Sequence, residues 1–395
     1  MIPKKPIYLD NNATTPLDPE VLDAMLPFFR ESFGNPSSIT HSYGWEAKLA
    51  VENAREAAAH LIGAREPSSI VWTSGATESN NLAIQGIFQT FIENRRPAHL
   101  VTTQTEHKAA LDVARNLERR GIEVTYIKPD RYGQISADSI FAAIRPHTQM
   151  ISVIHANNEI GTINPIDEIG IEARNRKVLF HVDAAQSTGK IPIDVEASAI
   201  DFLSVSAHKI YGPKGIGLLY VNRDLIKSSR LTPLFYGGSQ EHGLRPGTLN
   251  VPGIVGLGRA CEICQQRITD EPPKLAKMRD QFTHDVIERV RRAGASKGIS
   301  AQLNGHPTER VYSNISLSFH GLSADIFALG LSQIAASSGS ACSAGEPSHV
   351  LAAIGLPEEL ARATVRLGMG RFTTSQDLEV AANQIQAMVE NSVVP

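Results

Sequence analysis

The sequence predicts an α/β protein built on a mostly parallel sheet with helices on both faces. Short apolar runs of strand length alternate with amphipathic stretches of helical period from about residue 40 to about residue 225. This alternation is typical of strand–helix–strand units, in which each helix returns the chain so that the next strand runs parallel to the last. After Pro252 the pattern changes to long helices and a few short strands. We therefore expect a large domain followed by a smaller α+β domain.

The alternating region contains candidates for seven strands and four helices. The strands are expected at 70–73, 100–103, 124–127, 150–155, 179–183, 202–205 and 216–221, and the helices at 45–62, 78–93, 108–119 and 167–174. Two further helices, at 254–268 and 274–292, are expected on either side of Glu271-Pro272-Pro273, and strands near 313–319 precede the last helices. We assign residues 15–256 to the large domain and residues 1–14 with 257–395 to the small domain. Ligands of such sheets bind at the carboxyl ends of the strands.

Composition excludes several functional classes. The 395 residues are 42% hydrophobic and 20% charged with a net charge of −3, so we expect no nucleic-acid surface, which would need clustered basic charge. No apolar run approaches the roughly 18 residues that suggest a membrane span, and residues 1–16 lack the apolar core of an export signal. Three cysteines exclude a disulfide scaffold and are compatible with the reducing cytoplasm.

The segment Ser206–Gly215 contains the most informative lysine. Lys209 follows the apolar run 202–205, stands next to His208, and precedes a turn rich in glycine and proline. A lysine held at the end of a buried strand suits Schiff-base chemistry, because desolvation favours its neutral, nucleophilic form. The alternative, for Lys209 taken alone, is an ordinary solvated turn lysine.

Thr73–Asn81 joins an expected strand to an expected helix. The free N–H groups and the dipole of a helix N-terminus bind phosphate well, Gly75 permits close approach of the backbone, and the hydroxyl of Thr77 can add a bond. The alternative is a plain helix cap by Ser74 or Thr77. The spacing matches neither the dinucleotide-binding nor the P-loop motif, which disfavours dinucleotides and nucleoside triphosphates.

Three other strand ends carry polar side chains. Asp183 could keep a pyridinium nitrogen protonated, and His107 could stack on a flat ring and transfer protons. The adjacent amides Asn157 and Asn158 could serve a phenolic oxygen or a substrate carboxylate. For each of these residues alone, a turn or cap role is the alternative.

The run Ala336–Gly345 consists of small residues around Cys342 and predicts a mobile loop with an accessible thiol. Cys261 and Cys264 instead lie on an expected amphipathic helix with no second ligand pair. Buried packing is the better interpretation there, and we expect no resident metal.

Taken together, these segments resemble the cysteine desulfurases of the NifS/IscS type, which belong to the class V, fold-type I enzymes that use pyridoxal phosphate. The resemblance extends from Tyr8–Thr15 (YLDNNATT) to Val365–Thr374 (VRLGMGRFTT), nearly the whole chain. It implies a fold-type I architecture, with a mostly parallel seven-stranded sheet in the large domain.

The resemblance also implies roles for individual residues. Lys209 would bind pyridoxal 5′-phosphate covalently, Asp183 would pair with its pyridine nitrogen, and His107 would lie on the face of its ring. The other implied contacts are those of Gln186 and Asn158 with the phenolic oxygen, those of Ala76, Thr77, Ser206 and His208 with the phosphate, and those of Arg366 and Asn35 with the substrate carboxylate. The segment Gly237–Thr248 would reach into the neighbouring subunit of a homodimer, where Thr248 completes the phosphate site.

The implied reaction converts L-cysteine to L-alanine and leaves its sulfur on Cys342 as a persulfide, for iron–sulfur clusters or a related pathway. A sulfur-acceptor or scaffold protein is an implied partner, and Cys342 could act as a transient iron–sulfur ligand. Only Ser343–Glu346 separates Cys342 from Pro347, a shorter connection than is usual in the family, which predicts modest basal turnover. Alternatives on the same fold are a selenocysteine lyase, a cystine C–S lyase and an aminotransferase. A scaffold protein without catalysis is disfavoured by the presence of Lys209, Asp183, His107 and Cys342 together.

Overall fold

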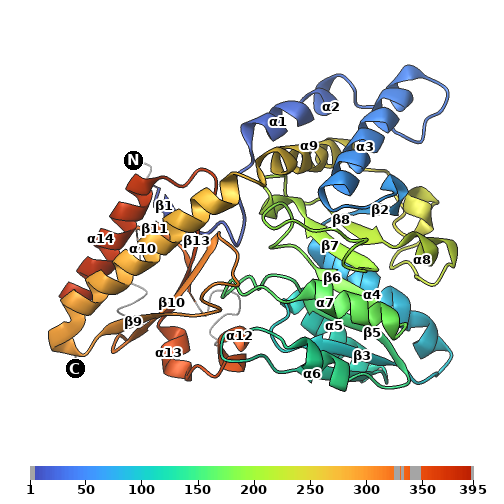
Figure 1. The fold of residues 1–395 in the computed structure, drawn as a ribbon. Coiled ribbons are helices and arrows are strands. Elements are labelled where there is room, and N and C mark those ends of the chain that lie inside the picture. Colours follow the sequence, from blue (N-terminus) through green and yellow to red (C-terminus); the bar gives the residue numbers. More distant parts are fainter. Residues whose placement is uncertain (1–4, 324–329, 331–332, 339–347, 393–395) are drawn as a thin grey trace.

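The computed structural model describes residues 5–323, 330, 333–338 and 348–392. A seven-stranded sheet forms the centre of the large domain (Figure 1), and each strand begins and ends within two residues of its expected position. The strands are β2 (Ile70–Thr73), β3 (His99–Thr103), β4 (Glu123–Ile127), β5 (Thr148–Ile154), β6 (Leu179–Asp183), β7 (Phe202–Ser206) and β8 (Gly217–Val221).

The strand order β2-β8-β7-β6-β5-β3-β4 brings distant chain segments to one edge of the sheet. Strand β8 runs antiparallel to both of its neighbours, β2 and β7, and all the other pairings are parallel. Strand β2 therefore points in the same direction as β3 to β7. The turns that follow these six strands consequently lie along the same edge.

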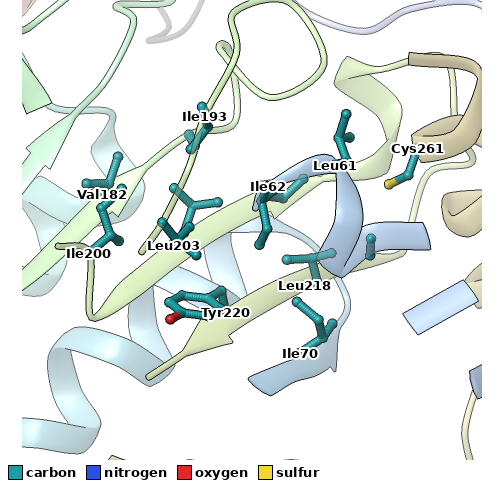
Figure 2. Close-up of a cluster of buried hydrophobic side chains, with 14 of the residues drawn as sticks. Leu61, Ile62, Ile70, Val182, Ile193, Ile200, Leu203, Leu218, Tyr220 and Cys261 are labelled. Carbon is teal, nitrogen blue, oxygen red and sulfur yellow. The ribbon is translucent and has the colours of Figure 1, made fainter. Parts of the chain in front are cut away.

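Side chains from both faces of this sheet are buried, which explains why its strands appear in the sequence as continuous apolar runs. On β8, Leu218 and Tyr220 point into one core, whereas Leu219 and Val221 point into the other. Figure 2 shows part of the first core, which includes Leu218 and Tyr220 of β8, Ile62, which follows helix α3, and Cys261 of helix α9.

Helices cover the two faces in separate layers. The first core is closed by α3 (Ser42–Leu61), α6 (Ala137–Ala142), α7 (Ile166–Asn175) and α9 (Val251–Arg267). The second is closed by α4 (Ala76–Glu93), α5 (Lys108–Arg119) and α8 (Arg223–Lys227). The large domain is thus a three-layer α/β structure, as expected.

The small domain contains an antiparallel sheet in the order β12-β13-β10-β9 and its own apolar core. Its strands are β9 (Ser300–Leu303), β10 (Asn314–His320), β12 (Ser337–Ser338) and β13 (Thr364–Gly368), and α10 (Glu271–Gly294) and α14 (Ser375–Asn391) pack along it (Figure 1). The N-terminal segment joins this domain, because β1 (Ile7–Tyr8) pairs in parallel with β11 (Ile334–Ala335) and Leu9 is buried in its core.

The expected boundary between residues 256 and 257 falls inside a continuous helix. Helix α9 carries Leu257, Cys261 and Cys264 into the core of the large domain. Helix α10 begins at Glu271, with Pro272 in its first turn, where a missing N–H breaks no helical bond. The packing therefore changes from one domain to the other between α9 and α10.

Several short elements were not assigned residue ranges from the sequence. They span at most seven residues, too few for an apolar period to be recognised. Besides α6 and α8, they are the helices α1 (Pro19–Met25), α2 (Pro27–Arg30), α12 (His349–Ala353) and α13 (Glu358–Arg362), and the 3-10 turns η1 (Pro67–Ser69), η2 (Ala207–Lys209), η3 (Gln240–Gly243) and η4 (Ala295–Lys297). None of the helices in the described part of the chain combines the length and apolar composition needed to cross a bilayer.

A buried ion pair fastens the segment Gly237–Thr248 to the sheet. Both oxygens of Glu241 accept bonds from Arg55, at 2.8 and 3.0 Å, and one of them also accepts the backbone N–H of Trp72 at 2.9 Å. Glu241 itself has a left-handed backbone, with φ of 48°. Because breaking a buried pair leaves an uncompensated charge, this contact holds the start of the segment firmly on β2.

Candidate active site

A cavity of about 840 Å³ opens at the carboxyl edge of the large sheet, and residues of both domains line it. The lining residues from the small-domain side include Asp10, Ser337 of β12 and Arg366 of β13. Ten of the residues expected from the sequence meet there: Ala76, Thr77, His107, Asn158, Asp183, Gln186, Ser206, His208, Lys209 and Arg366. The sheet order explains the meeting of the nine from the large domain, because they lie at or after strands that end at the same edge, whereas Arg366 comes from β13 of the small domain.

Lys209 lies in η2, immediately after the buried strand β7, and lines the cavity. Its Nζ donates to the backbone carbonyls of Asn12 and Ala13, both at 2.7 Å. These carbonyls belong to the segment that connects β1 to the large domain. The interpretation of Lys209 as a solvated turn lysine is therefore wrong: its side chain is half-buried and held at the wall of a cavity.

Asp183 ends β6 and is only 3% exposed. One carboxylate oxygen accepts from Nδ2 of Asn80 at 2.7 Å, and the other accepts the N–H of Ala185 at 3.0 Å. Within the described ranges no cation forms an ion pair with it. A buried, oriented carboxylate without a cation favours a positively charged ligand group in the cavity.

His107 caps helix α5, and this contact determines which of its ring nitrogens carries the proton. Nδ1 accepts the N–H of Ala109 at 3.1 Å, so Nε2 carries the proton of the neutral ring. Desolvation by the surrounding walls lowers the pKa of His107, and Asp183 opposes the shift. At pH 7 the ring is consequently neutral and open to the cavity, as a stacking partner should be.

The N-terminus of helix α4 forms the part of the cavity suited to phosphate. Its N-cap is Gly75, with φ of 151°, and no side chain caps the helix, so the alternative of a side-chain cap is wrong. Gly217 allows the close approach of β8, because a Cβ there would lie 2.6 Å from Cα of Gly75. The helix therefore directs backbone N–H groups into the cavity next to Ser206 and His208.

His208 can bind an anion beside the N-terminus of α4 as a neutral ring. Desolvation, followed by the repulsion of Lys209 and Lys214, lowers the pKa of His208 to about 4. Its Nδ1 lies 3.2 Å from the hydroxyl of Thr14. The neutral ring can hold one hydrogen bond to Thr14 and offer its other nitrogen to a ligand.

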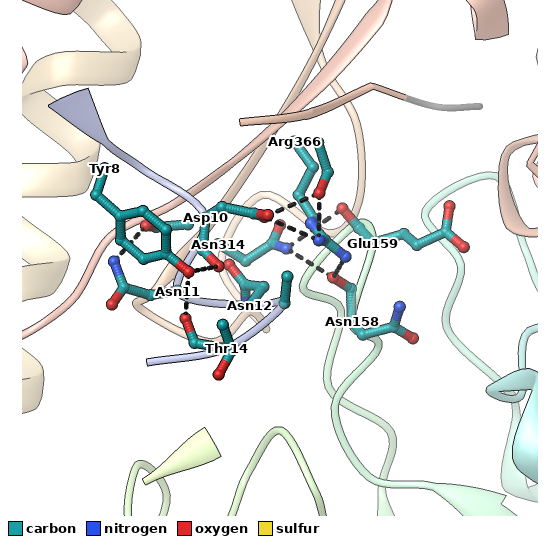
Figure 3. A network of polar contacts seen from close by, with 12 residues as sticks. Tyr8, Asp10, Asn11, Asn12, Thr14, Asn158, Glu159, Asn314 and Arg366 are labelled. Atoms are coloured by element: carbon teal, nitrogen blue, oxygen red, sulfur yellow. Dashed lines mark hydrogen bonds and ion pairs between the residues drawn. The ribbon is translucent and has the colours of Figure 1, made fainter. Parts of the chain in front are cut away.

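Arg366 stands on β13, at the centre of a polar network (Figure 3). Its guanidinium donates to Asp10 at 3.0 Å, to the hydroxyl of Ser337 at 2.7 Å and to the carbonyl of Asn158 at 3.1 Å. Its Nε is buried and has no hydrogen-bond partner in the part of the chain that the structure describes. An oriented guanidinium with a spare buried donor suits a substrate carboxylate.

The two adjacent asparagines have different tasks. The Asn157 carboxamide closes a turn: its oxygen accepts from Glu159 and Ile160, and its nitrogen donates to Thr105. Asn158 instead lines the cavity. This geometry supports the choice of Asn158 over Asn157 as the residue that faces a ligand.

Three expected site residues are not placed in the cavity. Asn35 is exposed, and its side chain accepts the N–H of Ser37 at 2.9 Å, so within one chain the structure does not bring it to Arg366. Thr248 is also exposed and lies away from this chain's own cavity. Cys342 lies outside the described residues.

Sequence reasoning missed several residues that hold the site together. Asp10 and Asn12 come after a strand of two residues and carry no periodic pattern, and Ser337 lies in an equally short strand. Asn80 occurs in the phosphate-site segment, but only its contact with Asp183 reveals its role. These residues share a location at the cavity wall or directly behind it. That location depends on the tertiary fold, so the local sequence does not reveal it.

Comparison with known proteins agrees with this geometry. The family "Aminotransferase class-V" matches residues 7–380. "Cysteine desulfurase IscS" of Rickettsia rickettsii is 46% identical over 387 residues, covering 98% of this chain and 91% of that protein. The mouse "Cysteine desulfurase" is 45% identical over 382 residues, covering 96% of this chain and 80% of its own length.

Solved structures of related proteins point to the same family. A "NIFS-LIKE PROTEIN" superposes with a TM-score of 0.86 at 34% identity, covering 97% of this chain and 99% of its own. "SspA in complex with cysteine" superposes with a TM-score of 0.78 at 40% identity, covering 93% and 99%. The chain belongs to the cysteine desulfurases of the class-V aminotransferase family.

Cysteine desulfurases depend on pyridoxal phosphate, and the cavity has the features that this cofactor needs. Its phosphate would meet the uncapped N-terminus of α4, and its pyridinium nitrogen would meet Asp183, which lacks a cation. Lys209 and the neutral ring of His107 line the same cavity. The donors, the carboxylate and the lysine therefore fit the cofactor of this family.

Glu106, next to His107 in the sequence, gives this desulfurase a pH-dependent stability. It is fully buried; one oxygen accepts from Thr103 at 2.7 Å and from Ile154 N–H at 2.8 Å, and the other has no partner among the described residues. Burial raises its pKa from 4.5 to about 8. The folded state thus keeps a proton that the unfolded state releases above about pH 4.5, so this contribution to stability is lost as the pH rises towards 8.

We expect Glu106→Gln to become more stable relative to wild type as the pH rises from 5 to 8, because glutamine releases no proton. The measurement is the difference in melting temperature between variant and wild type across this range, with cofactor saturating. Glu56→Gln, at an exposed position on α3, is the matched control and should follow wild type. A difference for Glu106→Gln that does not change with pH would contradict this prediction.

Proposed function

We propose that this chain converts L-cysteine to L-alanine and transfers the sulfur to Cys342. The observation that carries the proposal is the meeting of Lys209, Asp183 and Arg366 in one cavity, in a chain of the cysteine desulfurase family. Lysine and aspartate suit the cofactor, whereas an arginine with a spare buried Nε suits an amino-acid carboxylate. The complex of the related SspA with cysteine supports cysteine as the substrate.

The residues have separate tasks in this reaction. Arg366 orients the substrate by its carboxylate, and Lys209 is the base placed to remove and return protons at the substrate carbons. His107 covers the ring and carries its proton on Nε2. Bound in the cavity, pyridoxal phosphate supplies an electron sink for the charge released at the substrate Cα.

Sulfur transfer needs a second nucleophile, and Cys342 is the proposed one. Its thiolate forms a bond to the substrate sulfur, and the bond between that sulfur and Cβ breaks. The electron pair of the broken bond stays with the carbon fragment, which takes up protons and leaves as alanine. Cys342 retains the sulfur as a persulfide, so atoms and electrons balance without an added oxidant.

A homodimer is part of this proposal. Residues 22–49 expose seven large apolar side chains, with Phe33 66%, Ile39 77% and Leu49 63% exposed, and Tyr236 beside the Gly237–Thr248 segment is 82% exposed. Such concentrations of exposed apolar surface are typical of protein interfaces. Contact with a second copy would cover them and bring Thr248 to the partner's phosphate site.

Thr248→Ala is therefore expected to weaken cofactor binding by about 1.5–3 kcal/mol, the usual loss for one hydrogen bond to a charged group. The measurement is cofactor retention during dialysis, with the oligomeric state followed by sedimentation. Thr374→Ala, which removes a helix cap at a residue that does not line the cavity, controls for general destabilisation. A wild-type protein that is monomeric and fully loaded with cofactor would contradict both the shared site and the dimer.

The last step of the proposed reaction is the transfer of the sulfur from Cys342 to another protein. An acceptor or scaffold protein would take the persulfide from Cys342 for iron–sulfur cluster assembly or a related pathway in the cytoplasm. The short connection from Cys342 to Pro347 leads us to expect slow basal turnover that rises when an acceptor or a strong reductant removes the sulfur.

The test is an assay of the holoenzyme with L-cysteine that measures alanine and sulfide, with and without reductant, followed by mass analysis of the peptide containing Cys342. The proposal predicts alanine in both cases, free sulfide mainly with reductant, and a mass increase of one sulfur atom on Cys342. Pyruvate and ammonia in place of alanine, or alanine with no sulfur on Cys342, would overturn it.

A further inference from the structure

Lys190 is a buried lysine directly behind the cofactor cavity that the proposed reaction does not use. It follows β6 in a turn where its N–H donates to the carbonyl of Ser187 at 2.9 Å, and it is only 6% exposed. The structure records no ion pair for its ammonium group among the residues it describes. Its side-chain hydrogen bond is to Oε1 of Gln186, at 3.4 Å.

An unpaired buried ammonium group is costly for folding, so its presence needs another reason. Burial, followed by the repulsion of Lys209, lowers the pKa of Lys190 to about 7. Among the described residues, the carboxylate of Glu271 on α10 opposes this shift. A methionine would fill the same space without this cost. We therefore expect the benefit of a lysine here to be its effect on neighbouring residues.

The neighbour that Lys190 contacts is a cavity residue. Oε1 of Gln186 accepts from Lys190 at 3.4 Å and from Nδ2 of Asn12 at 3.3 Å, while Nε2 donates to the carbonyl of Asn12 at 2.8 Å. The same carbonyl accepts from Nζ of Lys209 at 2.7 Å. The nitrogen end of the Gln186 amide is thus on the Lys209 side, and the oxygen end is on the Lys190 side.

Lys190 and the Asn12 carbonyl determine this orientation together. In its charged form, which predominates below its lowered pKa, Lys190 has donors only, and a carbonyl has acceptors only. If the Gln186 amide were reversed, its NH₂ would face the ammonium group and its oxygen would face the carbonyl. The Asn12 side chain can rotate to suit either orientation, so it does not decide between them.

We propose that Lys190 is a positioning residue that holds Gln186 with its N–H towards the oxygen on the cofactor ring. The proposal rests on the binding of pyridoxal phosphate in the cavity, but not on the fate of the sulfur. A donor fixed next to that oxygen stabilises its anionic form and so disfavours a proton on the adjacent nitrogen of Lys209. Loss of Lys190 should therefore raise the pKa of the cofactor–Lys209 linkage and weaken cofactor binding.

The test uses Lys190→Met, Gln186→Leu and the double variant, all loaded with pyridoxal 5′-phosphate and studied without cysteine. The readouts are the pH titration of the cofactor absorbance, the dissociation constant of the cofactor, and the melting temperature of the cofactor-free protein. We expect each single variant to raise the titration midpoint by about half a unit or more and to weaken binding several-fold. The double variant should match Gln186→Leu, and cofactor-free Lys190→Met should melt no lower than wild type.

Two outcomes would overturn the proposal. If Lys190→Met shifts the midpoint equally in the presence and the absence of Gln186, the lysine acts through its charge and not through the glutamine. If the cofactor-free protein is destabilised while midpoint and affinity stay unchanged, Lys190 is only structural. Because no measurement uses cysteine, a failure of the desulfurase reaction would not change either readout.

Discussion

Lys209→Ala is expected to lower the conversion of cysteine to alanine by on the order of 10³-fold or more, because it removes both the covalent bond to the cofactor and the base beside the substrate. Lys209 is the lysine that η2 places at the cavity wall against the carbonyls of Asn12 and Ala13. The variant should still bind the cofactor non-covalently through the N-terminus of α4 and Asp183.

Borohydride reduction followed by peptide mapping checks this prediction. In wild type the pyridoxyl group should be found on Lys209, and in Lys209→Ala no peptide should carry it. Lys214 also lines the cavity, so Lys214→Ala is the matched control and should still be labelled on Lys209. A label on Lys190 or Lys214 in the wild-type protein would show that another lysine holds the cofactor.

Cys342→Ala is expected to keep the absorbance of the bound cofactor and to bind cysteine, yet to make little alanine. The physical reason is that the sulfur of cysteine leaves readily only when a thiolate takes it. An unperturbed thiol is a few per cent thiolate at pH 7, and nearby cations increase that fraction. Selenium can leave without such an attack, so the variant should retain much of any activity towards selenocysteine.

The other two cysteines are matched controls for this experiment. Cys261 and Cys264 are buried in α9, where burial raises the pKa of Cys261 far above its usual range and that of Cys264 to about 11. Both are therefore thiols at pH 7, and Cys261→Ala should retain alanine formation. If Cys342→Ala releases alanine and sulfide from cysteine at the wild-type rate, a lyase should replace the desulfurase proposed here.

The large sheet illustrates what local sequence can predict. The strands of that sheet are buried on both faces except for the edge strand β4, of which only Ile127 is buried, so most of them are apolar runs bounded by polar turns. The four long helices between its strands, α3, α4, α5 and α7, were predicted with the correct order, whereas the short α6 and α8 were not. Local sequence did not predict α2, with four residues, and the boundary assigned after residue 256 cut through the helix expected at 254–268, which the structure has as α9.

Local sequence likewise predicts some residues of the candidate site and not others. Lys209, Asp183, His107 and the Gly75 segment each follow a predicted strand, and parallel strands bring such positions to one edge by geometry alone. The pairing of Asp10 with Arg366 joins residues 356 positions apart and has no local signature. The expected contact of Asn35 with Arg366 came only from the resemblance, and the fold of a single chain leaves Asn35 exposed at a turn.

By itself, then, the sequence determined the layers of the large domain, the edge at which a ligand binds, and the family to which the motifs belong, because each of these follows from patterns within about 20 residues. The tertiary structure alone decided which donors and carboxylates face one another. It placed Asn80 against Asp183, left Nε of Arg366 without a partner among the described residues, and buried Lys190 next to Gln186. Such contacts depend on how sheets and helices pack, and packing joins residues whose separation along the chain carries no periodic pattern.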